Sequence, residues 1–234
     1  MYDPQVLLQQ IDAQKWLVMT LFGVDSLFQV WWLSDAVRVA KRDRAYSIPL
    51  FCTLFWFAHD FGCVVRFQDW FFVYDHWYLK LFWGVLLLAN LLEWFFLWQV
   101  HRYGREELAP DLSPRGFGWL LAAGVLLALV AHELFKGSFG DPLFQLDPTL
   151  TMIVYPAFGA AMLLRRRSAR GQTPRMWWNF TAMTALFHLT TYLCFGPAFQ
   201  TVPYVAAAVV ATLGGVAMAW VVAQPRWRYA TVAP

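Results

Sequence analysis

Seven ionisable side chains lie inside long apolar runs of the sequence, namely Asp25, His59, Asp60, Glu93, His132, Glu133 and His188. Placing such a group in the hydrocarbon of a membrane costs about 2.5–3.5 kcal/mol at a helix centre, so each one is a functional candidate. A carboxyl group in a low-dielectric pocket can stay protonated at neutral pH, as a general acid must. Asp60, deep in the apolar segment FWFAHDF, and the histidines near it are therefore predicted acid–base groups.

Each of these groups also has a structural interpretation, which the sequence leaves open. Asp25 and His188 could pair with each other, Glu93 could cap a helix or hold helices together, and His132 could be solvated near an interface. A metal site is not expected, because no two histidines share one apolar run and the sequence has no Cys-x2-Cys pair.

Aromatic residues make up 19% of the chain, including 14 Trp. About half of the Trp residues lie near the ends of apolar runs, where an interfacial belt is expected. Others, such as Trp56 near Asp60 and Trp94 beside Glu93, lie within the runs, where they either fill the packing or line a wall for a hydrophobic or cationic ligand. The residues predicted to bind substrate are Asp25, Phe55, Trp56, His59, Trp83 and Trp94.

Membrane-spanning helices must position these side chains. Of the 234 residues, 59% are hydrophobic and only 14% are charged, against about 25% charged in an average soluble domain. Apolar runs long enough to cross a bilayer recur along the chain, which excludes a soluble enzyme, a disordered chain and a secreted disulfide-rich protein. The predicted spans are 16–36, 47–65, 77–100, 117–135, 150–164, 176–195 and 202–222.

The distribution of Lys and Arg predicts the orientation of these spans. The loops after the first, third and fifth spans, together with the C-terminal tail, hold 14 of the 18 Lys and Arg residues. This places the C-terminus in the cytosol and the N-terminus outside, in agreement with an odd number of spans. At about 1.5 Å per residue, Asp25, Asp60, His132 and His188 then lie in the outer half of the bilayer and Glu93 in the inner half.

The predicted fold class is an all-α membrane protein, a single bundle of seven transmembrane helices over residues 1–234 with the N-terminus outside and the C-terminus cytosolic. The connections between spans are short, so no separate soluble domain is expected. The localisation is multi-pass in a bacterial inner membrane or the endoplasmic reticulum. The sequence leaves the oligomeric state open.

The two ends of the chain lie outside this predicted bundle. Residues 1–15 are expected to form a short interfacial helix with Val6, Leu7 and Ile11 on one side. No cleavable signal peptide is expected, because these residues lack a basic start followed by an apolar core. Residues 224–234 are expected to form a short tail.

Four segments, in this order, carry a resemblance to a known family. They are VWWLSDAVRVAKRDRAYSIPLFCTLFWFAHDF around Asp60, then Glu93 followed by HRYGREE, then AHELF around His132, and RRRSARGQTPRMWWNF before the sixth span. Together, over residues 20–220, they resemble the small seven-helix, membrane-bound terpene cyclases of fungal meroterpenoid and indole-diterpene pathways and their bacterial relatives.

The motifs show one match in position and two departures from that family. Counting from Tyr46, Asp60 falls where the family's catalytic acid falls. The family's Trp-Glu pair is His59-Asp60 in this chain. The family's second acid, in the seventh span, has no counterpart, because residues 212–215 hold no carboxylate. The substrate, the proton acceptor and the reaction itself therefore stay open.

The resemblance implies an acid-initiated cyclisation of a prenyl chain that carries a terminal epoxide or alkene and enters from the membrane. Asp60 would protonate the chain, the cation would close rings beside aromatic side chains, and Glu93, His132 or His188 would remove the last proton. The implied catalytic set is thus Asp60, Glu93, His132 and His188. The implied partners are a lipophilic prenylated substrate and the lipid bilayer, with no cofactor and no nucleic acid.

A second class of function, a small-solute or vitamin-type membrane transporter with a Trp-lined site, also stays open. That interpretation predicts helices that are unwound by Gly or Pro near the middle of the membrane. The residues that could break a predicted span in this way are Pro156 in the fifth, and Gly214 and Gly215 in the seventh. A purely structural or assembly protein is a third possibility, but it would have little need for Asp60.

Overall fold

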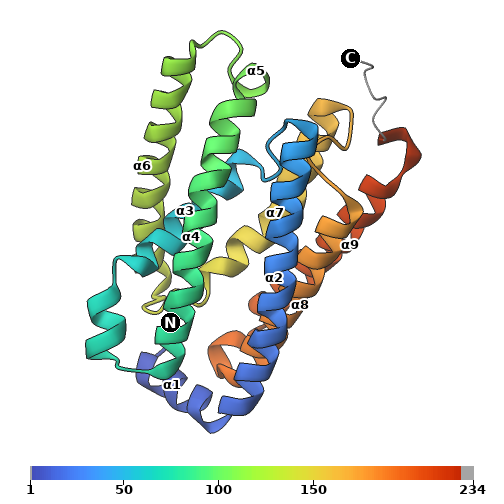
Figure 1. Cartoon of the computed structure of the whole chain (residues 1–234). Coiled ribbons are helices and arrows are strands. Elements are labelled where there is room, and N and C mark those ends of the chain that lie inside the picture. Colours follow the sequence, from blue (N-terminus) through green and yellow to red (C-terminus); the bar gives the residue numbers. More distant parts are fainter. Residues whose placement is uncertain (1, 228–234) are drawn as a thin grey trace. The chain divides into compact units, whose positions relative to one another are not determined.

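The computed structural model describes residues 2–227, and all regular secondary structure in them is helical (Figure 1). The chain divides into two compact units. The first comprises the described residues up to Lys15 together with Leu50–Thr151, and the second comprises Trp16–Pro49 together with the described residues from Met152 onward. The predicted all-α class is confirmed, whereas the closure of both units into a single seven-helix bundle stays a prediction.

The first unit is built around three helices that pack against one another, the short apolar helix α3 and the long helices α4 and α6. Its elements are α1 (Pro4–Ala13), α3 (Leu50–Val64), the π-helix η1 (Asp69–Val73), α4 (Trp77–Tyr103), α5 (Arg105–Leu108) and α6 (Pro114–Phe139). Small residues let α3 and α6 approach closely, since a Cβ added at Gly124 of α6 would lie 3.2 Å from a methyl group of Leu54 in α3.

Helix α1 begins at a cap, because the Asp3 carboxylate accepts hydrogen bonds from two backbone amides of the first turn. Residues 4–13 are helical, with Leu7 and Ile11 buried and Val6 49% exposed, and the interfacial placement of this helix stays a prediction. The buried side chains are Leu7, Leu8 and Ile11. At 3.6 residues per turn Val6 lies about 140° around the helix from Ile11, with Leu7 between them.

The described part of the second unit, up to Trp227, contains four longer helices and two short 3₁₀ helices. They are α2 (Lys15–Asp43), α7 (Asp147–Arg166), α8 (Pro174–Cys194), η2 (Pro197–Phe199), α9 (Val202–Ala223) and η3 (Pro225–Trp227), and the first residues of α2 and α7 belong to the first unit. Helix α8 packs along α9. A Cβ added at Gly215 of α9 would lie 3.3 Å from the Phe180 ring, so the small residue permits this close packing.

Within residues 2–227, five helices are long and apolar enough to cross a membrane, namely α2, α4, α6, α7 and α9. They fit a multi-pass membrane protein, as the sequence predicts. The predicted spans 47–65 and 176–195 also form helices, but they differ from these five. Helix α3 has 15 residues, or about 23 Å of helix, against about 30 Å of hydrocarbon in a bilayer. Helix α8 has the length but carries several polar side chains.

The ends of the helices differ from the predicted ends where polar side chains find partners. Helix α2 continues past residue 36 to Asp43 through a polar segment, and its Asp35 is bound by Arg175 of α8. Helix α7 begins at Asp147 and not at residue 150, because a side chain of the preceding loop caps its start. Polar residues beyond the apolar runs thus extend both helices.

Pro156 and the pair Gly214-Gly215 do not interrupt their helices, since α7 and α9 run unbroken through them. A Cβ added at Gly214 would lie 2.9 Å from Pro156 Cγ, so the glycine makes room for the proline ring of the neighbouring helix. These residues pack α7 against α9, and the unwound segments that the transporter interpretation predicts do not occur at these positions.

The predicted tail is described only up to Trp227, where η3 ends. Residues 228–234 lie outside the described residues. The backbone amide of Ala169, in the loop after α7, donates a hydrogen bond of 2.9 Å to the carbonyl oxygen of Trp227. The described start of the tail therefore lies beside the arginine-rich loop that joins α7 to α8.

Candidate functional site

His59 and Asp60 of α3 form a buried pair in the first unit, with exposed fractions of 3% and 6%. His59 Nδ1 lies 2.7 Å from Asp60 Oδ1, and His59 Nε2 lies 3.2 Å from the backbone carbonyl oxygen of Phe144. A carbonyl oxygen only accepts hydrogen bonds, so Nε2 must carry a hydrogen and donate it. The contact between Nδ1 and Oδ1 then holds one further proton, either as imidazolium with carboxylate or as imidazole with carboxylic acid.

A second pair joins His132 of α6 to Asp147, the first residue of α7. His132 Nδ1 lies 3.0 Å from Asp147 Oδ2, which is an ion-pair distance, although the angles are not those of a hydrogen bond. The carboxylate favours the hydrogen on Nδ1 and leaves Nε2 with a free lone pair. Nε2 has no hydrogen-bond partner within residues 2–227. Gly62 makes room for this ring, since a Cβ there would lie 3.4 Å from His132 Nε2.

The two pairs are neighbours. The His59 and His132 rings meet edge to face with their centroids 5.7 Å apart, and Asp60 interacts electrostatically with both histidines and with Asp147. Asp60 keeps 9% of its side chain exposed, against 4%, 1% and 7% for His59, His132 and Asp147. The cluster therefore brings one shared proton and one free imidazole nitrogen close together, and Asp60 is its most accessible member.

Phe144 lies at the centre of this cluster in a backbone conformation that aromatic residues rarely adopt. Its φ of +59° falls in the left-handed region, which costs about 1–3 kcal/mol for such a residue. The His132 ring stacks on the Phe144 ring at 5.3 Å. The cationic groups of Arg66 and Lys136 lie 4.7 Å and 4.1 Å from its centroid, and such cation–π contacts offset part of the strain.

The loop that carries Phe144 is held by Asp141. The Asp141 carboxylate accepts hydrogen bonds of 2.8 to 3.0 Å from the backbone amides of Gln145, Leu146 and Asp147, and it therefore caps the start of α7. The Tyr2 hydroxyl also donates to Asp141. These bonds fix the loop so that the Phe144 carbonyl faces His59.

Glu93 of α4 is 7% exposed and accepts a hydrogen bond of 3.2 Å from Asn90, whose amide also donates to the Phe57 carbonyl of α3 at 3.4 Å. Glu93 also interacts electrostatically with Asp60. The structure thus associates Glu93 with the cluster through charge, and no direct hydrogen bond joins it to either histidine–aspartate pair within residues 2–227.

The four aromatic residues predicted to bind substrate have separate positions in the first unit. Phe55 is buried and stacks on Phe51 at 4.9 Å. Trp56 Nε1 donates to Thr151 Oγ1 at 2.6 Å, and Trp83 Nε1 donates to the Val64 carbonyl at 3.0 Å. Trp94 is 55% exposed and meets Phe57 edge to face at 4.9 Å. Their roles toward a substrate stay predictions.

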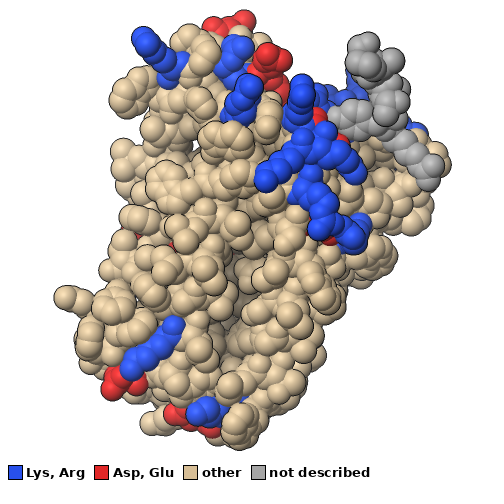
Figure 2. Space-filling model, viewed as in Figure 1, with Lys and Arg blue, Asp and Glu red and all other residues tan. Residues whose placement is uncertain are grey.

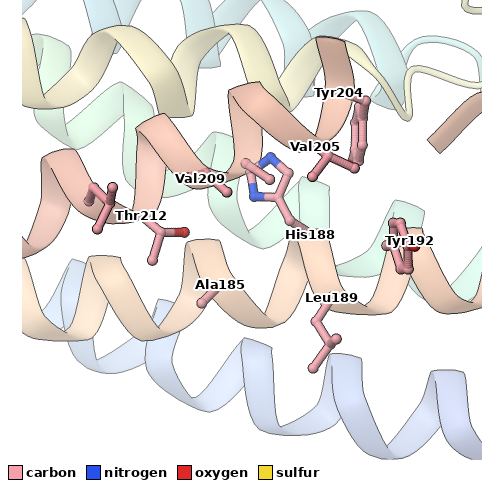
Figure 3. A pocket seen from close by; sticks show the side chains of 10 residues that line it. Ala185, His188, Leu189, Tyr192, Tyr204, Val205, Val209 and Thr212 are labelled. Atoms are coloured by element: carbon pink, nitrogen blue, oxygen red, sulfur yellow. The ribbon is translucent and has the colours of Figure 1, made fainter. Parts of the chain in front are cut away.

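Asp25 and His188 belong to the second unit, where both are buried. His188 Nδ1 donates to the Thr184 carbonyl at 2.7 Å, while His188 Nε2 and Asp25 Oδ1 have no hydrogen-bond partner within residues 2–227. The structural interpretation in which Asp25 and His188 bind each other is therefore wrong. His188 turns toward its own helix backbone on one side and toward α9 on the other (Figure 3).

Outside the membrane-spanning helices, the titratable groups of the first unit with shifted pKa values include Tyr2 and Asp12. Burial and the nearby Asp141 carboxylate raise the pKa of Tyr2, so its hydroxyl keeps the proton that it donates to Asp141. Burial raises the pKa of Asp12, but hydrogen bonds from Trp77 and His76 outweigh it, and the pKa is lowered overall. The Trp77 bond, at 2.6 Å, ties α1 to the start of α4.

Sequence reasoning missed Asp147, Asp141 and Phe144. The signal for the two aspartates is present, since each precedes a proline, and Asp-Pro is typical of a helix start. The sequence carries no signal for the role of Phe144, because this role depends on its backbone carbonyl and its left-handed φ and not on the type of its side chain. Within residues 2–227 no three His, Cys, Asp or Glu side chains are arranged to hold a metal ion.

Comparisons with known proteins add no relative, since no family model, no curated protein and no solved structure matches the chain.

Proposed function

We propose that this chain is a membrane-bound terpene cyclase that closes rings in a prenyl chain by transferring protons, with Asp60 as the acid. The observation that supports this proposal is the pair of adjacent histidine–aspartate contacts. His59 and Asp60 share a proton at 2.7 Å, and His132, whose ring centroid is 5.7 Å from that of His59, has a free Nε2. A reaction that takes up one proton and releases another needs such a donor and such an acceptor.

In the proposed reaction the Asp60 carboxylic acid gives its proton to the epoxide oxygen or terminal alkene of the substrate. The C–O bond of the epoxide breaks, or the alkene becomes a cation, and alkene electrons form the new carbon–carbon bonds. His132 Nε2 removes a proton from carbon, with Glu93 as the alternative acceptor, and the proton returns to Asp60. The product is an isomer of the substrate, so no oxidant or reductant is needed. Before the transfer His59 Nδ1 accepts the hydrogen bond of the Asp60 carboxylic acid, because His59 Nε2 carries the hydrogen of the neutral ring.

We further propose that all seven predicted helices cross the membrane. In α8 the hydroxyl groups of Thr181, Thr190 and Thr191 donate to backbone carbonyls four residues earlier at 2.7 to 3.0 Å. Hydroxyl groups bonded in this way are compatible with a lipid environment, because each of these three donors is paired within its own helix. Asp25, Asp60, Glu93, His132 and His188 are all buried, as ionisable groups in a membrane span should be.

The proposed orientation places the C-terminus in the cytosol and the N-terminus outside. In the second unit, Arg and Lys side chains gather where α2 and α7 end and α8 begins (Figure 2). Arg170 donates to the Asp43 carbonyl at 2.9 Å, and the tail reaches the same loop through Trp227. In the first unit Arg102 lies in the last turn of α4. Both arrangements agree with the positive-inside rule.

The cyclase proposal is tested with purified protein, a panel of prenylated epoxides and alkenes, and mass spectrometry of the products. Asp60→Asn, which keeps the size of the side chain, should abolish cyclised product and leave a folded protein by size-exclusion chromatography in detergent. Glu133→Gln is the matched control, because this carboxylate lies next to His132 in sequence but is bound by Arg66 at 2.6 Å and is half exposed. It should retain turnover.

A reaction started by a proton should also place one deuterium on carbon when an alkene substrate is cyclised in D₂O. Full turnover by folded Asp60→Asn would overturn the role of Asp60. If no substrate of the panel is cyclised and liposomes that contain the protein take up a solute, the transporter interpretation replaces the enzyme. For the orientation, a C-terminal green fluorescent protein should fluoresce and a C-terminal alkaline phosphatase should be inactive, and the reverse pattern would contradict it.

A further inference from the structure

A pocket of about 450 Å³ opens between α8 and α9 in the second unit, and none of its lining residues takes part in the proposed proton transfer. Figure 3 shows that α8 supplies Ala185, His188, Leu189 and Tyr192, and that α9 supplies residues from Tyr204 onward. Its volume falls in the range of about 300–1,000 Å³ that is usual for small-molecule sites. Apart from His188, Thr212 and the two tyrosines, its lining is aliphatic.

The pocket is open to the surroundings of the helices. Leu189, Tyr192, Val209 and Leu213 line it and are 45%, 42%, 50% and 61% exposed. If α8 and α9 lie in a bilayer, these side chains face lipid, so an apolar molecule dissolved in the membrane reaches the pocket without crossing water. The pocket therefore favours a hydrophobic chain over a polar solute.

His188 adds one polar atom to this apolar site. Its side chain is 4% exposed, and its Nδ1 donates to the Thr184 carbonyl at 2.7 Å. Because a carbonyl only accepts, the hydrogen is on Nδ1, and the neutral ring has a lone pair on Nε2. Nε2 has no hydrogen-bond partner within residues 2–227, and the ring points toward α9 between Val205 and Val209 (Figure 3). A buried acceptor without a partner favours a ligand that donates a hydrogen bond.

We propose that this pocket binds a long-chain alcohol, whose hydrocarbon chain lies along α9 and whose hydroxyl group donates a hydrogen bond to His188 Nε2. A hydroxyl is the simplest group that is both a donor and compatible with an apolar chain, whereas an ether or an ester oxygen cannot donate. The small size of Ala185 and Ala208 leaves the room for the chain. Asp60 does not line this site, and its test measures binding and not turnover.

The probe is a single-chain primary alcohol with a photoreactive diazirine in its chain, and the comparison probe is its methyl ether. Both are added to the full-length protein in nanodiscs, and labelled peptides are mapped by mass spectrometry. We expect the alcohol to label α8 and α9 at the pocket, and to bind about fivefold or more tightly than the ether, as the loss of one buried hydrogen bond implies. His188→Leu should remove this preference and still bind the ether.

Two alanines of α9 provide a matched pair of variants. Ala208→Phe fills the pocket and should abolish labelling by both probes, while Ala206→Phe, at an exposed position that does not line the pocket, should leave it unchanged. Equal binding of alcohol and ether to the unmodified protein, or undiminished labelling of folded Ala208→Phe, would overturn the proposal. Diacylglycerol that competes as well as the alcohol would replace a single-chain ligand by a bilayer lipid.

Discussion

Gly159 of α7 allows Trp177 of α8 to pack against the helix backbone, and replacing it by alanine gives a sharp test of this packing. A Cβ added at Gly159 would lie 2.6 Å from Trp177 Cη2 and closer still to Cζ2. The indole cannot easily move away, because it stacks on Tyr155 at 4.6 Å and donates to Gln172 at 2.8 Å. Gln172 in turn donates to the Gly159 carbonyl at 3.0 Å.

Two effects of opposite sign decide the outcome for Gly159→Ala. Alanine in place of glycine within a helix stabilises by about 0.5–1 kcal/mol, and an extra methyl group forced into a packed core costs about 1–3 kcal/mol. With an overlap of this size the second effect should win, and the net loss should be about 1–2 kcal/mol. For a chain of this length that loss lowers the midpoint of thermal unfolding by roughly 2–8 °C.

The Trp177→Phe background separates these two effects. Phenylalanine lacks the outer ring atoms that collide with the new methyl group, so Gly159→Ala should there be neutral or stabilising by up to about 1 kcal/mol. The assay is thermal unfolding of the four proteins in detergent, followed by far-ultraviolet circular dichroism. The reasoning is refuted if Gly159→Ala lowers the midpoint equally in both backgrounds, or if it raises the midpoint when Trp177 is present.

Three further predictions use the same unfolding assay. Asp141→Ala should destabilise the first unit by about 1–3 kcal/mol and Asp141→Asn by less, because alanine leaves three backbone amides without their acceptor; equal effects would contradict this. Arg175→Ala should destabilise more than Arg38→Ala, because Arg175 makes two contacts with the buried Asp35 carboxylate and Arg38 makes one longer contact at 3.4 Å; equal losses would contradict it. The pKa of Asp12 is lower in the folded protein, so its contribution to stability is present above the pKa of an unfolded aspartate and is lost as pH falls through the folded pKa. Asp12→Asn should therefore weaken the loss of stability in acid. An unchanged acid profile would refute this.

The positions of the helices could be predicted because each membrane span is recognised from its own hydropathy and from the length needed to cross a bilayer, without reference to the rest of the chain. Every predicted span coincides with a helix, from α2 to α9. The ends could not be predicted in the same way, since they depend on distant partners. Asp35 stays within α2 because Arg175, far along the chain, binds it. The division into two units also has no signal in hydropathy, because it depends on which helices pack together.

The candidate site could be predicted in part for the same reason. Asp60, His59 and His132 stand out because ionisable groups are rare in apolar runs, and the structure brings these three together. Asp147 was missed because it lies just outside the apolar run that was used to define the fifth span. Asp25 and His188 do not pair, since Asp25 Oδ1 and His188 Nε2 have no hydrogen-bond partner within residues 2–227 and His188 Nδ1 donates to the Thr184 carbonyl.

Which nitrogen of His59 carries the hydrogen is set by the loop after α6 and not by α3. His59 and Asp60 are adjacent in sequence, but the Phe144 carbonyl, 85 residues from His59, is the group that assigns the hydrogen to Nε2. That carbonyl faces His59 because Phe144 has a φ of +59° and because Asp141 holds the loop. A histidine–aspartate pair in a sequence therefore predicts a shared proton. Which ring nitrogen shares that proton depends on the backbone carbonyl that binds the other nitrogen.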